Sequence, residues 1–186
     1  MTNVRVWWTM AVDDESETDM QQLAGRVALV TGAGSGIGRA NAVVMAARGA
    51  ALIVNDRDAD SALQTVALIE LAGGRAVSCV ADVSVCADIL QAIEQSQRAL
   101  GAVDILVNNA GIASGRLPFE AIDEAAIDRM FAVTVKGAMF CTRAVLPGMK
   151  ARRSGKIINT SSITALGSHK FGCNYAAAKA AVIGLT

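Results

Sequence analysis

Residues 27–38 read VALVTGAGSGIG, a short apolar run followed by a turn that contains four glycines. An apolar run of this length predicts a strand buried on both faces. Glycines let the backbone approach a pyrophosphate closely, and the N-terminus of the helix that follows directs free N–H groups at an anion. The segment predicts a nucleotide phosphate site. An ordinary tight turn stays an alternative, because Ile at position 37 breaks the G-x-G-x-x-G spacing.

Asp56 follows the next apolar run, residues 51–55, and stands 18 residues beyond Gly38. A carboxylate at this place can accept hydrogen bonds from both ribose hydroxyls of an adenosine, and it repels a 2′-phosphate. The glycine-rich turn and this acid together predict a nicotinamide cofactor site that prefers NAD to NADP. Arg39 and Arg57 stand close by in the sequence and could soften that preference, because guanidinium is the usual partner of phosphate.

Further along the chain, short apolar runs alternate with stretches of helical periodicity. The remaining predicted strands cover residues 76–80, 103–107 and 156–159. Strands that are apolar throughout and separated by helices predict a parallel sheet covered on both faces. We therefore expect an α/β fold with a doubly wound parallel sheet, the Rossmann fold, joined by right-handed crossovers.

Three helical stretches carry specific expectations. The helix that begins near Asp58 is expected to bury one face, made of Leu63, Val66, Ala67 and Leu71. Ser84 is expected to cap the N-terminus of the next helix. A long helical stretch covers residues 121–152, and the Pro-Gly pair at 147–148 is expected to interrupt it.

The composition fits one compact domain, because 53% of the 186 residues are hydrophobic and 18% are charged. Lys and Arg balance Asp and Glu at 17 each, and no basic run is present, so we expect neither a nucleic-acid partner nor a membrane span. Four scattered cysteines without Cys-x-x-Cys or Cys/His spacing predict no metal site, and thiols that stay reduced in the cytoplasm.

Residues 1–24 differ in character from the rest of the chain, because residues 13–19 (DDESETD) carry five acids and no base. We expect a disordered or loosely docked extension over residues 1–24 and a nucleotide-binding domain over residues 25–186. A misplaced start is an equal alternative, because Met20 stands just ahead of the domain.

Tyr175 and Lys179 stand four residues apart in YAAAK, an alanine-rich stretch that predicts a helix. This spacing places both side chains on one face, one turn apart. A phenol exchanges its proton poorly at neutral pH, but a neighbouring ammonium stabilises the phenolate and makes acid/base work feasible. Taken alone, the pair favours an exposed Tyr and Lys on an ordinary surface helix.

The motifs together resemble the short-chain dehydrogenase/reductase family, in particular its 3-oxoacyl-thioester reductases and alcohol dehydrogenases. The shared pattern is T-G-x-x-x-G-x-G at 31–38, the acid after the second strand, Asp82-Val83 after the third, N-N-A-G at 108–111, Ser162, and Y-x-x-x-K at 175–179. The resemblance covers about residues 24–186, with the motifs in the family's order.

The resemblance implies hydride transfer between a nicotinamide cofactor and a secondary alcohol or ketone, with 3-oxoacyl thioesters among the candidate substrates. It implies that the cofactor is held by Gly32, Ser35, Gly36, Ile37, Gly38, Asp56, Asp82, Val83, Asn109, Ala110 and Gly111. Tyr175 would give or take the proton at the substrate oxygen, and Ser162 would hold that oxygen. Lys179 would bind the nicotinamide ribose beside Tyr175 and stabilise the phenolate.

Two features depart from the family pattern. Thr134 stands where family members usually carry an Asn that helps to hold a relay water, and a hydroxyl lacks the paired donor and acceptor of an amide. The sequence also ends at Thr186, where family members continue into further strands, so we expect a truncated chain. A catalytically inactive nucleotide-binding fragment or pseudoenzyme is therefore the alternative to an active, NAD-preferring dehydrogenase.

The resemblance also implies partners. Besides a small alcohol or carbonyl substrate, it implies a homodimer or homotetramer of the full-length protein, formed through two helices around a two-fold axis. The apolar run expected at that contact consists of Ala132, Val133, Val135, Ala138 and Met139.

Overall fold

The computed structural model describes residues 21–113, 115, 118–167 and 172–186, and its centre is a parallel sheet of five strands. The strands are β1 (Val27–Thr31), β2 (Ala51–Asp56), β3 (Arg75–Val80), β4 (Ile105–Asn108) and β5 (Lys156–Asn159). Their order is β3-β2-β1-β4-β5, so the winding direction reverses between β1 and β4. The structure confirms the predicted doubly wound α/β fold, and all five predicted strands are present within two residues of their expected bounds.

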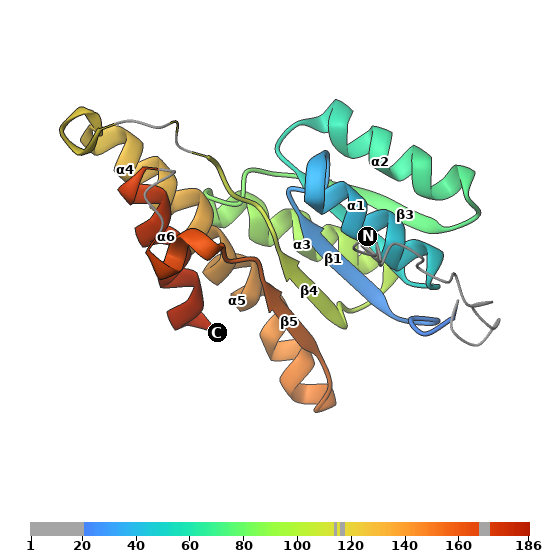
Figure 1. Ribbon diagram of the computed structural model, residues 1–186. Helices are drawn as coiled ribbons and strands as arrows, with labels where there is room; N and C mark the ends of the chain where they lie inside the picture. The colour runs from blue at the N-terminus through green and yellow to red at the C-terminus, as the bar shows by residue number, and fades with distance from the viewer. Residues whose placement is uncertain (1–20, 114, 116–117, 168–171) are drawn as a thin grey trace, which may run out of the picture.

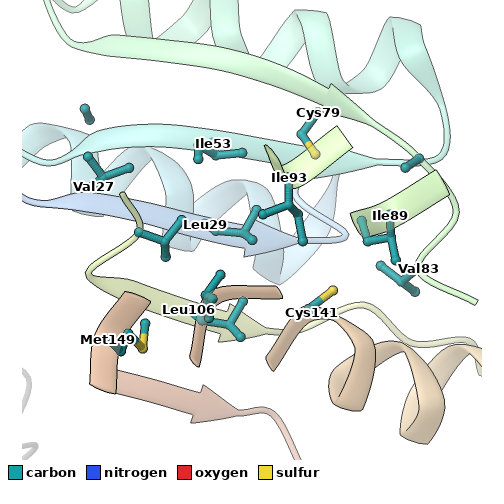
Figure 2. Close-up of a cluster of buried hydrophobic side chains, with 14 of the residues drawn as sticks. Val27, Leu29, Ile53, Cys79, Val83, Ile89, Ile93, Leu106, Cys141 and Met149 are labelled. Atoms are coloured by element: carbon teal, nitrogen blue, oxygen red, sulfur yellow. The ribbon is translucent and has the colours of Figure 1, made fainter. Parts of the chain in front are cut away.

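Helices cover both faces of the sheet (Figure 1). On one side lie α1 (Gly36–Ala47) and α2 (Ala59–Leu71), and on the other α3 (Cys86–Leu100) and α5 (Gly137–Arg152). Side chains of β1 alternate between the two cores: Leu29 points to the α3 and α5 side, and Val30 to the α1 and α2 side. Figure 2 shows Leu29 in the first core together with Ile93 of α3 and Cys141 of α5.

The buried face of α2 differs from the predicted one. Its buried residues are Ala62, Thr65, Val66 and Ile69. Leu63 is 53% exposed, Leu71 is 88% exposed and Ala67 is exposed as well, so the prediction was wrong for these three side chains and right only for Val66. The cause is Thr65, whose hydroxyl donates to the backbone oxygen of Ala33 at 2.9 Å and so lies in the core.

The long helix also differs from expectation, because Pro147 does not interrupt it. The segment begins as α4 (Glu124–Phe131), widens into a π-helical turn η2 (Ala132–Lys136), and continues as α5 through Pro147 to Arg152. The missing N–H of one proline is tolerated where neighbouring turns are fixed by packing, and Val145 and Met149 on either side are buried.

By length and apolar content, the continuous helix Glu124–Arg152 would pass as a membrane span. Its side chains at Cys141, Val145 and Met149 lie in the core beside the sheet, which is the environment of a core helix. Of the apolar run expected at a subunit contact, Val133 and Ala138 are likewise buried within this chain, whereas Met139 is 47% exposed. The first two are therefore not free to face a second copy.

Residues 1–20 of the expected extension lie outside the described residues. The last four residues of the extension, 21–24, dock on the domain. The Leu23 N–H donates to the backbone oxygen of Arg48 at 2.8 Å, and the Leu23 side chain packs against the core on the α1 side. This end of the extension is thus docked, one of the two states expected for it.

Candidate functional site

A cleft of about 480 Å³ opens where the carboxyl ends of β1, β2, β3 and β4 meet. The structure brings all eleven residues predicted along the first four motifs to its lining: Gly32, Ser35, Gly36, Ile37, Gly38, Asp56, Asp82, Val83, Asn109, Ala110 and Gly111. Clefts at the carboxyl ends of parallel strands, beside the point where the strand order reverses, are the usual ligand sites of doubly wound sheets. The roles of these residues as cofactor ligands stay predictions.

The glycine-rich turn after β1 is packed too tightly for larger residues. A Cβ atom added at Gly38 would lie 2.1 Å from the backbone oxygen of Gly32, and one at Gly34 would lie 2.7 Å from Asp56 Oδ2. Helix α1 begins directly after the turn, and the side chain of Ser35 at its N-cap makes no capping hydrogen bond. The first-turn N–H groups therefore face the cleft without a side-chain cap, as an anion would require.

The carboxylate of Asp56 lines the cleft and is held by two backbone N–H groups. Its Oδ2 accepts from the Gly34 N–H at 2.9 Å, and its Oδ1 accepts from the Asp58 N–H at 3.1 Å. Arg39 lies behind the turn: its guanidinium donates to the Gly34 oxygen and, at 2.9 Å, to Thr65 Oγ1. Of the two arginines that could meet a 2′-phosphate, only Arg57 lines the cleft.

Beyond β3, Asp82 is surrounded by donors. Its Oδ1 accepts from the Ser84 N–H at 2.9 Å and from the Ser84 hydroxyl at 2.6 Å, and its Oδ2 accepts from Arg129 Nη2 at 2.8 Å. Burial alone would raise the pKa of Asp82, but these hydrogen bonds and the Arg129 charge outweigh it and lower the pKa to about 2. The prediction that Ser84 caps α3 was therefore wrong. The Ser84 side chain bonds to Asp82 instead, and Val85 occupies the N-cap.

Sequence reasoning missed Arg129, which lines the same cleft from α4. Its Nη1 donates to Ser84 Oγ at 2.8 Å in addition to the ion pair with Asp82. The two partners of that pair stand 47 residues apart. A contact of this kind leaves no local pattern, so no sequence signal could have indicated it.

The turn after β4, residues 109–111, lines the cleft beside the glycine-rich turn. Asn109 Nδ2 donates to the backbone oxygen of Thr31 at 2.9 Å, and the N–H groups of Asn109 and Ala110 both donate to Thr31 Oγ1 at 3.0 Å. The buried Asn108 donates to Asn159 Oδ1 at 2.9 Å, which ties β4 to β5. These bonds fix residues 108–111 relative to the glycine-rich turn.

On the other side of β4, helix α6 (Cys173–Leu185) carries Tyr175 and Lys179 on one face, as their spacing predicted. Lys179 Nζ lies 5.9 Å from the centroid of the Tyr175 ring and donates to the backbone oxygen of Thr160 at 2.7 Å. Lys179 is only 4% exposed, and this burial lowers its pKa from the ordinary value of 10.5. An ammonium that is partly stripped of water acts more strongly on its neighbours.

Ser162 and Thr134 lie on the elements that surround α6. Ser162 caps the short helix η3 (Ile163–Leu166), which packs against α6, and its Oγ accepts from the Thr164 N–H at 3.3 Å and from the Thr164 hydroxyl at 2.9 Å. Thr134 is buried in η2. A Cβ atom built on Gly111 would lie 3.5 Å from Lys179 Nζ and 3.9 Å from Thr134 Oγ1, so all three residues meet around one point.

Metal chemistry finds no support in the described part of the chain. No group of three or more His, Cys, Asp or Glu side chains lies close enough there to hold a metal ion. The four cysteines are unpaired thiols, and burial raises the pKa of Cys141 to about 12.

The chain is similar in sequence and in structure to known proteins. The family described as short chain dehydrogenase matches residues 26–186. An uncharacterized oxidoreductase of Thermotoga maritima is 39% identical over 165 residues, which cover 87% of this chain and 63% of that protein. The short-chain reductase protein NovJ of Streptomyces niveus is 40% identical over 178 residues, which cover 96% of this chain and 66% of that protein.

Among solved structures, a gluconate 5-dehydrogenase from Burkholderia cenocepacia, in complex with NADP and tartrate, superimposes with a TM-score of 0.84 at 38% identity. The match covers 91% of this chain and 66% of that one. The chain thus spans just under two thirds of the length of the relatives described above.

Proposed function

Because this chain belongs to the short-chain dehydrogenase family, we propose that it forms the cofactor-binding and catalytic part of an NAD(P)-dependent oxidoreductase. The reaction is hydride transfer between a nicotinamide cofactor and a secondary alcohol or ketone, and 3-oxoacyl thioesters are among the candidate substrates. The observation that carries the proposal is the buried ammonium of Lys179 one helical turn from Tyr175, beside a cleft lined by glycines and Asp56.

The residues of the cleft fit a dinucleotide. Its volume of about 480 Å³ lies within the range of small-molecule sites, roughly 300–1,000 Å³. The glycine-rich turn and the first turn of α1 would bind the pyrophosphate, and Asp56 would bind the adenosine ribose. Residues 109–111 would support the nicotinamide half, toward Lys179. When bound, the cofactor supplies or accepts the hydride.

The proton moves through the side chains of this chain. In ketone reduction the Tyr175 hydroxyl gives its proton to the substrate oxygen, and in alcohol oxidation the phenolate takes it back. The charge of Lys179 stabilises that phenolate, and the Thr160 oxygen holds Lys179 in place. Ser162 Oγ accepts two hydrogen bonds from Thr164, so its own O–H is left to donate to the substrate oxygen.

We further propose that NAD is the preferred cofactor. Asp56 lines the cleft, and its carboxylate would bind the adenosine ribose there, so a 2′-phosphate would meet it with like charge. The gluconate 5-dehydrogenase described above holds NADP, so the fold itself does not exclude that cofactor. Free thiols in the chain suit a reducing compartment, and we place the protein in the cytoplasm as a homodimer or homotetramer.

The test is cofactor binding by the purified chain, together with binding and turnover by the full-length protein. NAD⁺ and NADP⁺ are titrated by calorimetry, and NADH production or consumption is followed over a panel of secondary alcohols, ketones and 3-oxoacyl thioesters. We expect tighter binding of NAD⁺ and turnover of at least one panel member. Binding without any turnover would favour the inactive nucleotide-binding alternative, and absence of binding would overturn the proposal.

A further inference from the structure

Arg129 is part of the cleft, yet the motifs do not include it. It reaches from α4 across the loop after β3, and its side chain is 40% exposed at the cleft. Its two terminal nitrogens bind different partners: Nη2 donates to Asp82 Oδ2 and Nη1 to Ser84 Oγ, each at 2.8 Å. The Ser84 hydroxyl in turn donates to Asp82 Oδ1. The three side chains therefore form a closed ring in which every donor has a fixed direction.

The strand order indicates where the three side chains lie relative to a bound cofactor. This step rests on the proposed function. With the pyrophosphate at α1 and the ribose at Asp56, the purine lies further out along the order β1-β2-β3. The cleft residues at the end of β3 are Ala81, Asp82 and Val83, and Arg129 faces them. The edge of the purine therefore meets the ring of Asp82, Ser84 and Arg129.

The helix that carries Arg129 is fixed to the same loop a second time. A Cβ atom added at Gly137 would lie 2.7 Å from Val83 Cγ2, so the start of α5 packs directly on the residue after Asp82. Two contacts, one on either side of η2, hold the loop against the helix. Arg129 is consequently held in register with Asp82.

The chemistry of the ring selects one kind of purine. Held ionised by its partners, the Asp82 carboxylate accepts hydrogen bonds and offers none. Adenine presents an amino group at position 6, which donates, whereas hypoxanthine and guanine present an oxygen there, which accepts. A carboxylate facing a 6-oxo group would leave two acceptors opposed and unsatisfied.

We propose that Arg129 is a positioning residue that makes the cleft specific for a 6-aminopurine dinucleotide, because it holds Asp82 as a fixed acceptor at the edge of the base. The residue acts through Asp82 and takes no part in hydride or proton transfer. Loss of Arg129 should free the carboxylate to rotate or to take up water, and so weaken discrimination more than affinity.

The experiment compares NAD⁺ with nicotinamide hypoxanthine dinucleotide, which differs at position 6 of the purine. Both are titrated into the purified chain by calorimetry. The parent protein is expected to prefer NAD⁺ by roughly tenfold or more, the size of one charged hydrogen bond. In Arg129→Met the preference is expected to fall to about twofold or less, and Arg129→Lys, which can pair with Asp82 alone, should keep part of it.

Two further variants separate positioning from general damage. Arg98→Met removes another arginine ion pair, the exposed contact with Glu94, and should leave the preference unchanged. Asp82→Asn should abolish or reverse the preference, because an amide can donate to the 6-oxo group. A merely structural role of Arg129 would weaken both ligands equally and keep their ratio.

The outcomes are distinct. A parent protein that binds both dinucleotides equally, or an Arg129→Met variant that keeps the full preference, overturns the inference and leaves the proposed function standing. A parent protein that binds neither overturns both. If Arg129→Met does not fold, Arg129→Lys and Asp82→Asn decide the inference, and an unchanged ratio in both of them rejects it.

Discussion

The two halves of the sheet, one on each side of the boundary between β1 and β4, differ in how much of their strands is buried. On the side proposed to bind adenosine (the adenosine side), every residue of β1 is buried and only Asp56 in β2 is not, whereas in the edge strand β3 only Ala76 and Cys79 are buried. On the catalytic side, made of β4, β5, η3 and α6, no residue of β5 is fully buried, and Ile158 is 50% exposed. Apolar burial thus holds the turns that would bind a nucleotide.

On the side proposed for catalysis, β4 and α6 also bury apolar side chains, but polar contacts hold β5 and Lys179. Lys179 Nζ donates to Thr160, the Ser161 hydroxyl donates to the Lys179 oxygen at 2.8 Å, and Asn108 donates to Asn159. One hydrogen bond contributes about 0.5–1.5 kcal/mol, whereas burial of one large apolar side chain contributes about 1.5–3 kcal/mol. The catalytic geometry should therefore open locally before the sheet unfolds, and binding and chemistry should be separable by mutation.

The largest expected effect is on chemistry alone. Tyr175→Phe keeps the ring but removes the transferable proton, so turnover by an active form of the protein should fall by about 10²–10⁴-fold. Affinity for NAD⁺, measured by calorimetry, should stay within about twofold. Substantial residual turnover would mean that another group does the acid/base work.

A substitution at Asp56, on the adenosine side, should change cofactor binding and not the chemical step. Asp56→Ala removes the charge that opposes a 2′-phosphate, so the preference for NAD⁺ over NADP⁺ should narrow by roughly tenfold. Asp123→Ala is the matched control, because its carboxylate accepts from the Ala126 N–H as the cap of α4 and does not line the cleft. It should cost about 0.5–2 kcal/mol of stability and leave the preference intact. Equal or tighter binding of NADP⁺ by the parent protein would contradict this account.

The contrast in burial can be measured directly. Leu29 is fully buried in β1, so Leu29→Ala should lower the free energy of unfolding by about 2–5 kcal/mol. Ile158→Ala in β5 should lower it by about 1 kcal/mol or less, because half of that side chain is already in contact with water. Urea denaturation of both variants tests the difference, and equal losses would show that β5 contributes as much as β1.

The smallest expected effect concerns the buried ammonium. Because burial lowers the pKa of Lys179 below 10.5, the folded state favours its neutral form more than the unfolded state does. The cost of burying the charge is thus fully present at neutral pH and is relieved as the pH rises through the folded pKa toward 10.5. Lys179→Met should match or slightly exceed the parent in melting temperature at pH 7. The parent should gain relative to that variant as the pH rises, and a constant difference would contradict the sign.

Much of the fold could be predicted, because its signals are local. The five strands are short apolar runs, and the residues expected around the cofactor immediately follow β1, β2, β3 and β4. Since the carboxyl ends of parallel strands share one edge, such residues meet in space whatever the helices do. The helical spacing of Tyr175 and Lys179 likewise needed no tertiary information.

Features that depend on long-range contacts could not be predicted in this way. In α2, Thr65 faces the core and Leu63 faces water, because the Thr65 hydroxyl donates to the Ala33 oxygen in the turn after β1. Ser84 bonded back to Asp82, and Arg129 joined them from a helix 47 residues away along the chain from Asp82. By itself the sequence determined the order of strands and helices and the motifs at their ends, through local periodicity. Which polar side chains pair across that framework was decided only by the tertiary structure, because a hydrogen bond between distant residues has no period in the sequence.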